Sequence, residues 1–381
     1  MNVISTAELR DRIDTDEPFA LVDTRLDESF DAWRIEGAIQ FPHKPSYEFD
    51  VREFADVTGL DPEDTIYTIC AKGKASRSLA AALEAAGYED VTVVDDGMRG
   101  WSAVYDHARL DLDGVELVQI QRRAKGCLGY VVARNGHAAV FDPTRHTEEF
   151  VAAADALEAN IEAVFDTHVH ADHISGGRRL AAELDVPYYL GADAIDRGVE
   201  ADYESLDRNE TVSVGDLTIK ALSTPGHTSE MVSYLLDDRG VVTGDTLFVD
   251  SVGRTELQFG DGDASTGAEL LYESLHGTLL AQPETVCVLP GHFPIANDGT
   301  TPVTPGEPIV ATIRAVRTGI DLLDRSREGF VQSITATLPE KPPNYRTVID
   351  VNRGVETIGD ESRAIELELG PNRCAAEPDA V

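Results

Sequence analysis

The chain has 381 residues, with 69 acidic and 32 basic side chains and a formal net charge of −37. This length exceeds what one hydrophobic core usually serves, so we expect two domains. The negative charge argues against nucleic acid or an acidic membrane surface as a partner, because phosphate recognition needs a basic face. No apolar run approaches the roughly 20 residues of a membrane helix, and the N-terminus lacks the apolar core of a signal peptide. We therefore expect a cytoplasmic protein.

Acidic residues are spread along the whole length and lysine is scarce. This pattern is typical of a solvated surface adapted to a high-salt, halophilic cytoplasm, where charge repulsion is screened. The four cysteines are far apart and form no CxxC pair, so we expect free thiols in a reducing compartment. These cysteines are Cys70, Cys127, Cys287 and Cys374.

The first 105 or so residues alternate between apolar runs typical of buried strands and segments typical of helices. Ser5 and Glu8 have the spacing of a capping box at a helix start. Strands are predicted at 19–23, 64–70 and 91–95, and an alanine- and leucine-rich helix at 76–87. Strand–helix–strand order of this kind predicts a parallel sheet with right-handed crossovers.

A cysteine closes the second of these strands. Between Cys70 and the helix lies a short turn with small residues, a glycine and two lysines. Backbone N–H groups of such a turn, with the helix N-terminus and the lysines, would stabilise a thiolate that carries or accepts anionic sulfur. The alternative is a buried, inert cysteine at a strand end, which is the interpretation favoured for the other three cysteines.

From about residue 115 the pattern changes. Short strands at 117–121, 129–133 and 138–142 indicate an antiparallel sheet, followed by a helix at 147–160. Later strands at 218–222, 240–242 and 285–289 are each followed closely by histidine or aspartate. The polar segment 105–114 is predicted to be the linker between the domains, and the tail after residue 370 is predicted to be disordered.

The motif HVHADH is the strongest signal in the chain. It places three imidazoles and one carboxylate within six residues at the end of a predicted strand, close enough to bind one or two metal ions. The motif residues are His168, His170, Asp172 and His173. Further candidate ligands at strand ends are His227, Asp245 and His292, each beside a glycine that lets the backbone turn tightly.

The N-terminal part resembles the rhodanese family. The resemblance rests on residues 21–25 (LVDTR), 35–39 (IEGAI) and 96–101 (DGMRGW), together with the cysteine loop. It implies that Cys70 holds a sulfane sulfur as a persulfide cradled by loop amides. The family often has an arginine five residues after the cysteine, where this chain has Ala75. Arg77 or the lysines would take the place of that arginine. The identity of the sulfur donor is therefore not determined by the resemblance. The implied cradle comprises Ala71, Lys72, Gly73, Lys74 and Ala75, with Arg77 beside it.

Residues 115–300 resemble the metallo-β-lactamase superfamily on the metal motifs just described. The resemblance implies a four-layer sandwich with two sheets inside, helices outside and the ligands on loops along one edge. Fold alone does not decide the reaction, and two classes compete.

In one class, similar to persulfide dioxygenases, His168, His227 and Asp245 would bind one Fe(II) and leave positions open for dioxygen and a thiol persulfide. Residues 252–256 (VGRTE) resemble the GRTD stretch of these enzymes, which makes Arg254 a candidate substrate contact. A rhodanese-like neighbour handles the same sulfane sulfur, and fusion raises its local concentration.

In the other class, similar to glyoxalase II, two Zn(II) ions would activate water to attack a thioester. His168, His170 and His227 would bind the first ion and Asp172, His173 and His292 the second, with Asp245 bridging.

The sequence thus predicts a rhodanese-like domain at 1–107, a metallo-β-lactamase-fold domain at 108–370 and a disordered tail at 371–381. The first interpretation is oxidation of a low-molecular-weight persulfide to sulfite, with sulfur carried on Cys70; the alternative is a dinuclear zinc thioester hydrolase. The small-molecule partners expected are a persulfide or thiosulfate. An unreactive Cys70 would instead make the first domain a sensing or docking module. Residues 300–370 could form a lid, a homodimer contact or simple packing on the sandwich.

Overall fold

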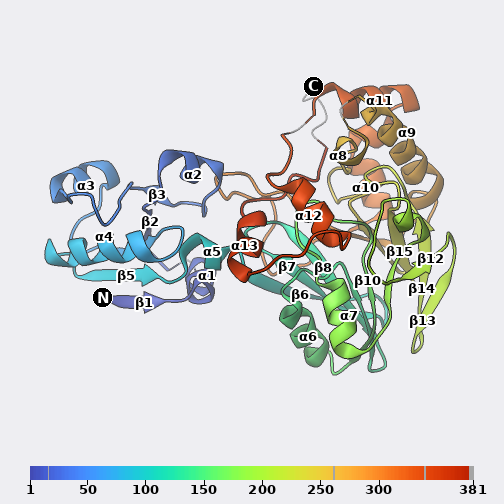
Figure 1. The fold of residues 1–381 in the computed structure, drawn as a ribbon, viewed down its shortest axis with the longest axis horizontal. Helices are drawn as coiled ribbons and strands as arrows, with labels where there is room; N and C mark the ends of the chain where they lie inside the picture. Colours follow the sequence, from blue (N-terminus) through green and yellow to red (C-terminus); the bar gives the residue numbers. More distant parts are fainter. Residues whose placement is uncertain (16, 261, 339, 377–381) are drawn as a thin grey trace.

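The computed structural model describes residues 1–15, 17–260, 262–338 and 340–376. It shows an N-terminal parallel-sheet domain beside a larger four-layer sandwich, as Figure 1 shows. The predicted fold class, a rhodanese-like parallel sheet followed by a metallo-β-lactamase sandwich, is confirmed.

The N-terminal domain is a sheet of five parallel strands in the order β1-β5-β4-β2-β3. Its strands are β1 (Asn2–Ile4), β2 (Ala20–Asp23), β3 (Ile39–Gln40), β4 (Thr65–Ile69) and β5 (Asp90–Val94). Its helices are α1 (Thr6–Asp14), α2 (Asp27–Ala32), α3 (Val51–Thr58), α4 (Lys74–Ala85) and α5 (Gly97–Trp101). The predicted capping box is present at α1, where the Glu8 amide donates to Ser5 Oγ at 3.1 Å and the Ser5 amide to Glu8 Oε2 at 2.7 Å.

The larger domain contains two sheets packed face to face. A seven-stranded sheet runs β12-β11-β10-β9-β8-β7-β6, and a six-stranded sheet runs β13 to β18 in chain order. The first comprises β6 (Tyr105–Asp111), β7 (Glu116–Arg122), β8 (Cys127–Arg134), β9 (His137–Phe141), β10 (Asn160–Phe165), β11 (Tyr188–Gly191) and β12 (Glu204–Leu206). The second comprises β13 (Thr211–Val214), β14 (Leu217–Ser223), β15 (Val232–Leu236), β16 (Gly240–Gly244), β17 (Cys287–Pro290) and β18 (Ala311–Thr312).

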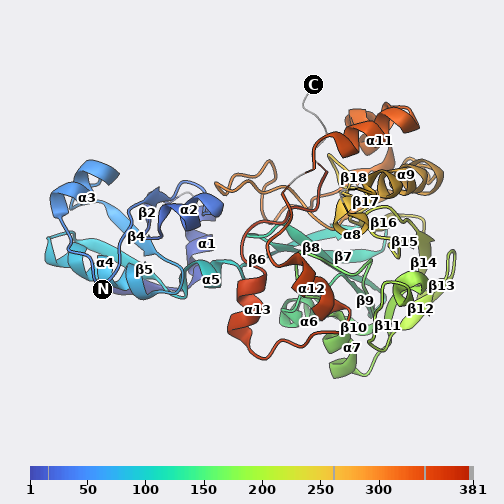
Figure 2. The same ribbon diagram turned by 45° about the horizontal axis from the view of Figure 1, so that its top comes forward.

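Helices cover both outer faces of the sandwich (Figures 1 and 2). On the seven-stranded sheet lie α6 (Thr147–Ala156) and α7 (Gly177–Leu184), and after β11 comes the short helix η1 (Ala192–Ile195). On the other sheet lie α8 (Glu256–Phe259), α9 (Ala264–Ser274), η2 (Leu275–Leu279), α10 (Ile313–Gly319), η3 (Asp321–Asp324) and α11 (Arg327–Ala336). Between the sheets, the rings of Phe141, Phe165 and Tyr234 pack within 5.5 Å of one another, centroid to centroid. Burial of these apolar faces is the main source of stability of such a sandwich.

The segment 105–114 is not a linker, contrary to our expectation. Most of it is strand β6, which pairs antiparallel with β7 from Tyr105 to Asp111. Tyr105 and Ala108 are buried, whereas His107 and Arg109 are exposed, so the polar residues that suggested a linker occupy the outer side of an edge strand.

The C-terminal segment packs closely on the sandwich. It contains α12 (Tyr345–Asn352) and α13 (Glu361–Leu367). The predicted disorder is wrong for residues 371–376, because the Arg254 amide donates to the Cys374 carbonyl and the Ala376 amide to the Val252 carbonyl, both at 2.9 Å. These bonds add a short strand-like pairing that composition did not reveal. Residues 377–381 of the predicted tail lie outside the described residues.

The two domains make direct contacts. The Arg34 amide donates to the Asn297 carbonyl at 2.9 Å, and Arg123 donates both terminal nitrogens to the carboxylate of Asp14, at 2.7 and 2.8 Å. Helix α13 lies beside α5 of the N-terminal domain (Figure 2). The Arg99 side chain of α5 donates to Ser362 of α13 at 2.8 Å.

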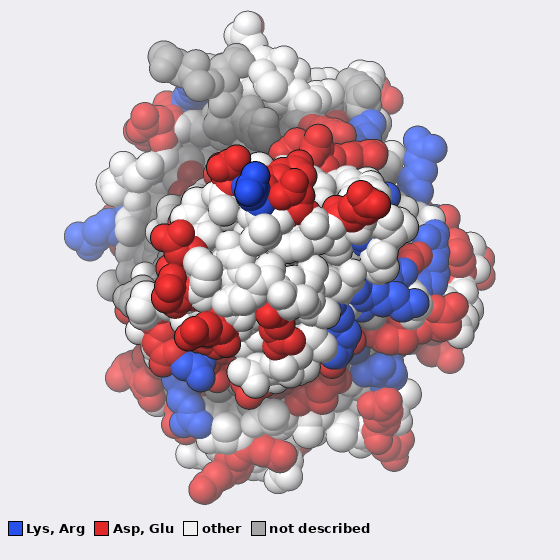
Figure 3. Space-filling view, turned by 90° about the vertical axis from the view of Figure 1, so that its left-hand side faces the viewer, with Lys and Arg blue, Asp and Glu red and all other residues white. Residues whose placement is uncertain are grey.

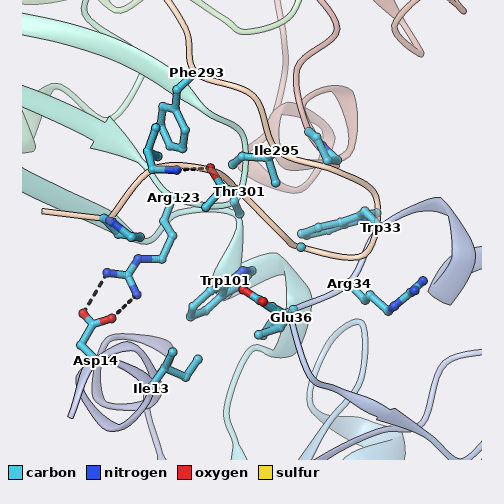
Figure 4. Close-up of a pocket in the computed structure, with 16 residues that line it drawn as sticks. Ile13, Asp14, Trp33, Arg34, Glu36, Trp101, Arg123, Phe293, Ile295 and Thr301 are labelled. Atoms are coloured by element: carbon cyan, nitrogen blue, oxygen red, sulfur yellow. Dashed lines mark hydrogen bonds and ion pairs between the residues drawn. The ribbon is translucent and has the colours of Figure 1, made fainter. Parts of the chain in front are cut away.

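A cavity of about 200 Å³ lies between the domains. Figure 4 shows Trp33 and Trp101 from the N-terminal domain opposite Phe293 and Ile295 from the loop after β17. These are the two tryptophans of the whole chain. Their fluorescence therefore reports on the contact between the domains.

The charge of the molecule is dispersed on the face that Figure 3 shows, which is the end formed by the N-terminal domain. Acidic side chains surround an uncharged centre, and basic side chains lie among them on both sides, more of them toward the right of the view. Among the described residues, no helix is long and apolar enough to cross a membrane.

Candidate metal centre and cysteine loop

All seven predicted metal ligands lie along one edge of the sandwich. The HVHADH motif follows β10, His227 follows β14, Asp245 follows β16 and His292 follows β17. Strand ends that share an edge of paired sheets bring side chains together from positions far apart in sequence. All seven side chains are buried, with exposed fractions of 4% or less.

One group of candidate ligands comprises His168, His227 and Asp245. The Nε2 atoms of His168 and His227 lie 3.8 and 3.4 Å from Asp245 Oδ2. His227 Nδ1 is 2.7 Å from the carbonyl of Arg254, so this nitrogen carries the proton and Nε2 keeps its lone pair. His168 Nε2 and Asp245 Oδ2 are buried without a hydrogen-bond partner. These orphaned atoms fit one metal ion bound by two imidazoles and one carboxylate.

A second group is formed by Asp172, His173 and His292 together with Cys127, which begins β8. His292 Nε2 is 3.0 Å from Asp172 Oδ2, and His173 Nδ1 is 3.1 Å from Asp172 Oδ1. The Cys127 thiol donates to Asp172 Oδ2 at 3.2 Å. Burial opposes ionisation of Asp172, but the two imidazoles hold its pKa well below the usual range. Residues predicted to bind a second metal are thus hydrogen-bonded to one another.

His170 belongs to neither group. Its Nε2 lies 3.3 Å from Asp142 Oδ1 and 3.8 Å from Asp166 Oδ1. Burial alone would lower the pKa of His170, but these two carboxylates raise it well above the usual value. Asp142 in turn accepts from the Thr167 amide at 2.7 Å. His170 therefore faces the carboxylates of Asp142 and Asp166.

The C-terminal segment supports the motif from its outer side. Asn352, the last residue of α12, donates to the carbonyls of His170 and His173 at 2.9 and 2.8 Å. Its Oδ1 accepts from the Ser175 amide at 2.9 Å. Of the roles left open for residues 300–370, packing on the sandwich is observed, and it reaches the metal motif itself.

Several residues at the site were not predicted. Cys127 was interpreted as inert and Cys374 lay in the predicted tail, yet Cys374 lies with Asp245 and His292. Asp142 stands at the end of a predicted strand, the same signal that identified Asp245. Asn352 had no local signal, because only the tertiary structure brings α12 to the motif.

Arg254, the candidate substrate contact, is buried with an exposed fraction of 1%. Its guanidinium pairs with Glu256 and donates to the carbonyls of Glu340 and Arg373. Its backbone carbonyl orients His227. In this structure the backbone of Arg254 therefore positions His227, and its side chain is covered by neighbouring segments of the chain.

The cysteine loop lies at the carboxyl end of β4. Cys70 is buried, and its Sγ lies 3.3 Å from Ser76 Oγ. Helix α4 begins at Lys74, two residues before the predicted start, because Gly73 adopts a left-handed conformation with φ of 80°. The loop from Ala71 to Ala75 thus turns directly into the helix N-terminus, which favours negative charge nearby.

Two of the basic residues near Cys70, Lys72 and Arg77, have acidic partners. Lys72 is exposed and its Nζ lies 3.6 Å from Glu366 Oε1 of α13. Arg77 donates to Asp95 at 2.8 Å, and this bond lowers the pKa of Asp95. The structure therefore places the Lys72 side of the loop next to the larger domain.

Comparison with known proteins agrees with this architecture. Residues 5–104 match the rhodanese-like domain model and residues 122–292 match the metallo-beta-lactamase superfamily model. A probable metallo-hydrolase of Bacillus subtilis, YqgX, is 34% identical over 35% of this chain and 68% of its own length. The chain belongs to the metallo-beta-lactamase superfamily.

Other members of the superfamily differ in reaction. Hydroxyacylglutathione hydrolase of Arabidopsis thaliana is 35% identical over 41% of this chain and 59% of its own length. Persulfide dioxygenase ETHE1 of Bos taurus is 29% identical over 50% of this chain and 69% of its own length. The crystal structure of ETHE1 from Myxococcus xanthus superposes with a TM-score of 0.51 at 27% identity, over 63% of this chain and 99% of that one. The chain thus spans less than two thirds of the Arabidopsis hydrolase.

Proposed function

We propose that this protein oxidises a low-molecular-weight thiol persulfide to sulfite with dioxygen at one Fe(II), and that Cys70 carries sulfane sulfur for it. His168, His227 and Asp245 would hold the iron. When bound, a ferrous ion with two imidazoles and one carboxylate on one face supplies open positions for dioxygen chemistry.

One observation carries the proposal. The unpaired Nε2 of His168 and Oδ2 of Asp245 converge with His227. In the second group, Asp172 is hydrogen-bonded to His173 and His292, and His292 also lies 2.6 Å from Asp245 Oδ1. His170 faces Asp142 and Asp166, although its ring nitrogens and Nε2 of His173 have no hydrogen-bond partner among the described residues. Buried polar atoms are rarely left unsatisfied, so an ion at the first group would balance them. The second group has satisfied much of its bonding capacity with Cys127 and its own members.

The chain's own residues prepare this site. The Arg254 carbonyl fixes the tautomer and the ring orientation of His227, and Asn352 holds the backbone of the motif. The buried setting excludes bulk water from the ligands. At the other site, the α4 N-terminus and the loop amides favour the anionic sulfur of a Cys70 persulfide. Similarity to ETHE1 in sequence and structure supports the same reaction class.

A dinuclear zinc thioester hydrolase is the second candidate. All seven residues such a centre would use lie on one edge of the sandwich, and the similarity to hydroxyacylglutathione hydrolase favours it. The two candidates differ in metal content and in the reagent consumed, so one experiment separates them.

The experiment loads the purified chain with Fe(II) under nitrogen, or with Zn(II), and measures bound metal by mass spectrometry. Oxygen uptake and sulfite formation are then followed with glutathione persulfide, and hydrolysis with a glutathione thioester. We expect one iron per chain and oxygen uptake matched by sulfite, both absent in His168→Ala. Two zinc ions per chain with thioester hydrolysis and no oxygen uptake would overturn the proposal.

A further inference from the structure

A carboxylate that belongs to none of the predicted ligand sets lies buried directly behind the metal motif. Glu368 follows α13 and has an exposed fraction of 1%. Its Oε1 accepts the backbone N–H of Ile174, the residue after the motif's last histidine, at 2.7 Å. A buried ion is costly unless it is paired, so this position needs a specific reason.

Two arginines provide the pairing. Arg145 Nε donates to Glu368 Oε2 at 2.6 Å and an Arg122 terminal nitrogen donates to the same oxygen at 3.1 Å. Arg122 is completely buried and Arg145 nearly so. Burial alone would raise the pKa of Glu368, but these guanidiniums and the Ile174 amide hold it at about 2. The carboxylate is therefore ionised at neutral pH.

The same cluster reaches the N-terminal domain. Arg122 Nε donates to the carbonyl of Ser102, which follows α5, at 2.7 Å. Two residues before Glu368, Glu366 pairs with Arg99 of α5 and lies near Lys72 of the cysteine loop. The end of α13 thus contacts the metal motif on one side and the cysteine loop on the other.

We propose that Glu368 is a positioning residue for the metal centre, which sets the turn of the HVHADH motif through the Ile174 amide. The inference rests on the metal centre of the proposed function. Glu368 fixes the backbone after His173, while Asn352 fixes the carbonyls of His170 and His173. Two anchors on the outer side of a tight turn determine how its histidines project inward. Residues that orient ligands in this way typically change metal affinity by about 10- to 100-fold when replaced.

Two variants and one control test this inference. Glu368→Gln keeps the size and removes the charge, leaving two buried guanidiniums without their carboxylate. Glu368→Asp keeps the charge and withdraws the oxygen from Ile174, so it carries the test where Glu368→Gln fails to fold. Glu361→Gln is the matched control, because Glu361 also pairs with Arg145 but is 68% exposed and does not contact the motif.

The probe is Co(II), added to the full chain, with its dissociation constant and its visible absorption spectrum as readouts. Unchanged tryptophan emission shows that the domains remain in contact, since both tryptophans line the cavity between them. We expect Glu368→Asp and Glu368→Gln to weaken Co(II) binding about 10- to 100-fold and to shift the spectrum. Glu361→Gln should match the wild type in both.

Folded Glu368 variants with wild-type Co(II) affinity and spectrum, but a lower melting temperature, would reduce Glu368 to a structural role and overturn the inference. A wild-type chain that binds no Co(II) would contradict the metal centre of the proposed function instead. Wild-type binding with unaffected variants contradicts the positioning role alone, so the two failures are distinguishable.

Discussion

Replacing His170 by glutamine should leave one metal ion per chain, although His170 lies in the middle of the metal motif. The structure turns its Nε2 toward Asp142 Oδ1 at 3.3 Å and Asp166 Oδ1 at 3.8 Å. His168, two residues earlier, instead shares its group with His227 and Asp245. His168→Gln should therefore abolish metal binding. A dinuclear zinc centre would use both histidines for the same ion and predicts the same loss for both variants.

The expected magnitudes follow from these contacts. Glutamine is neutral, so it leaves the buried carboxylates of Asp142 and Asp166 without the imidazolium that faces them, a loss of roughly 3–5 kcal/mol of unfolding free energy. Because the motif backbone can adjust, metal affinity could fall by as much as about 100-fold, as for residues around the ligands. At saturating metal the stoichiometry stays at one. In His168→Gln, which lacks a residue that would bind the metal directly, the stoichiometry does not return to one at saturating metal.

The assay titrates each variant with Fe(II) under nitrogen and measures bound metal after desalting, with denaturant unfolding to confirm the fold. Asn352→Asp is not a suitable control, because Asn352 holds the motif backbone. Cys287→Ala is suitable, since Cys287 lies on β17 outside the ligand groups. Equal loss of metal in His170→Gln and His168→Gln would refute the reasoning.

Three further predictions concern the sulfur site and the buried cluster. Cys70→Ala should abolish sulfur transfer from thiosulfate and leave oxygen uptake on added glutathione persulfide intact; transfer that survives would remove the role assigned to Cys70. Ser76→Ala removes the hydroxyl 3.3 Å from the Cys70 sulfur and should slow transfer about fivefold, the effect of one hydrogen bond of about 1 kcal/mol, measured against thiosulfate at saturation. Glu368 has its pKa lowered from 4.5 to about 2, so its ionisation contributes on the order of 3 kcal/mol of stability above about pH 4.5, which is lost as the pH falls toward 2. The gap in unfolding free energy between the wild type and Glu368→Gln should narrow over that range, and a gap independent of pH would contradict the ion-pair account.

Short-range sequence patterns predicted the strands and helices of the N-terminal domain, but they misassigned two segments whose structure depends on distant contacts. Alternating apolar runs and the Ser5 capping box predicted the parallel-sheet domain, because those signals act over a few residues. The polar segment 105–114 was misassigned, since an edge strand with one exposed face has the composition of a linker. Residues 371–376 were misassigned for a related reason: their order depends on hydrogen bonds to Val252 and Arg254, more than 100 positions away.

By itself, the sequence determined which residues are available for chemistry: the cysteine before a helix and the seven histidines and aspartates at strand ends. Those assignments depend on residue type and short spacing, and the resemblance to the two families predicts the folds of the two domains. Only the tertiary structure decided how the seven divide, with His168, His227 and Asp245 together and His170 turned to Asp142. It also brought Glu368 to Ile174 across 194 positions. Side-chain direction and long-range contacts arise from packing of the whole chain, which no short stretch of residues encodes.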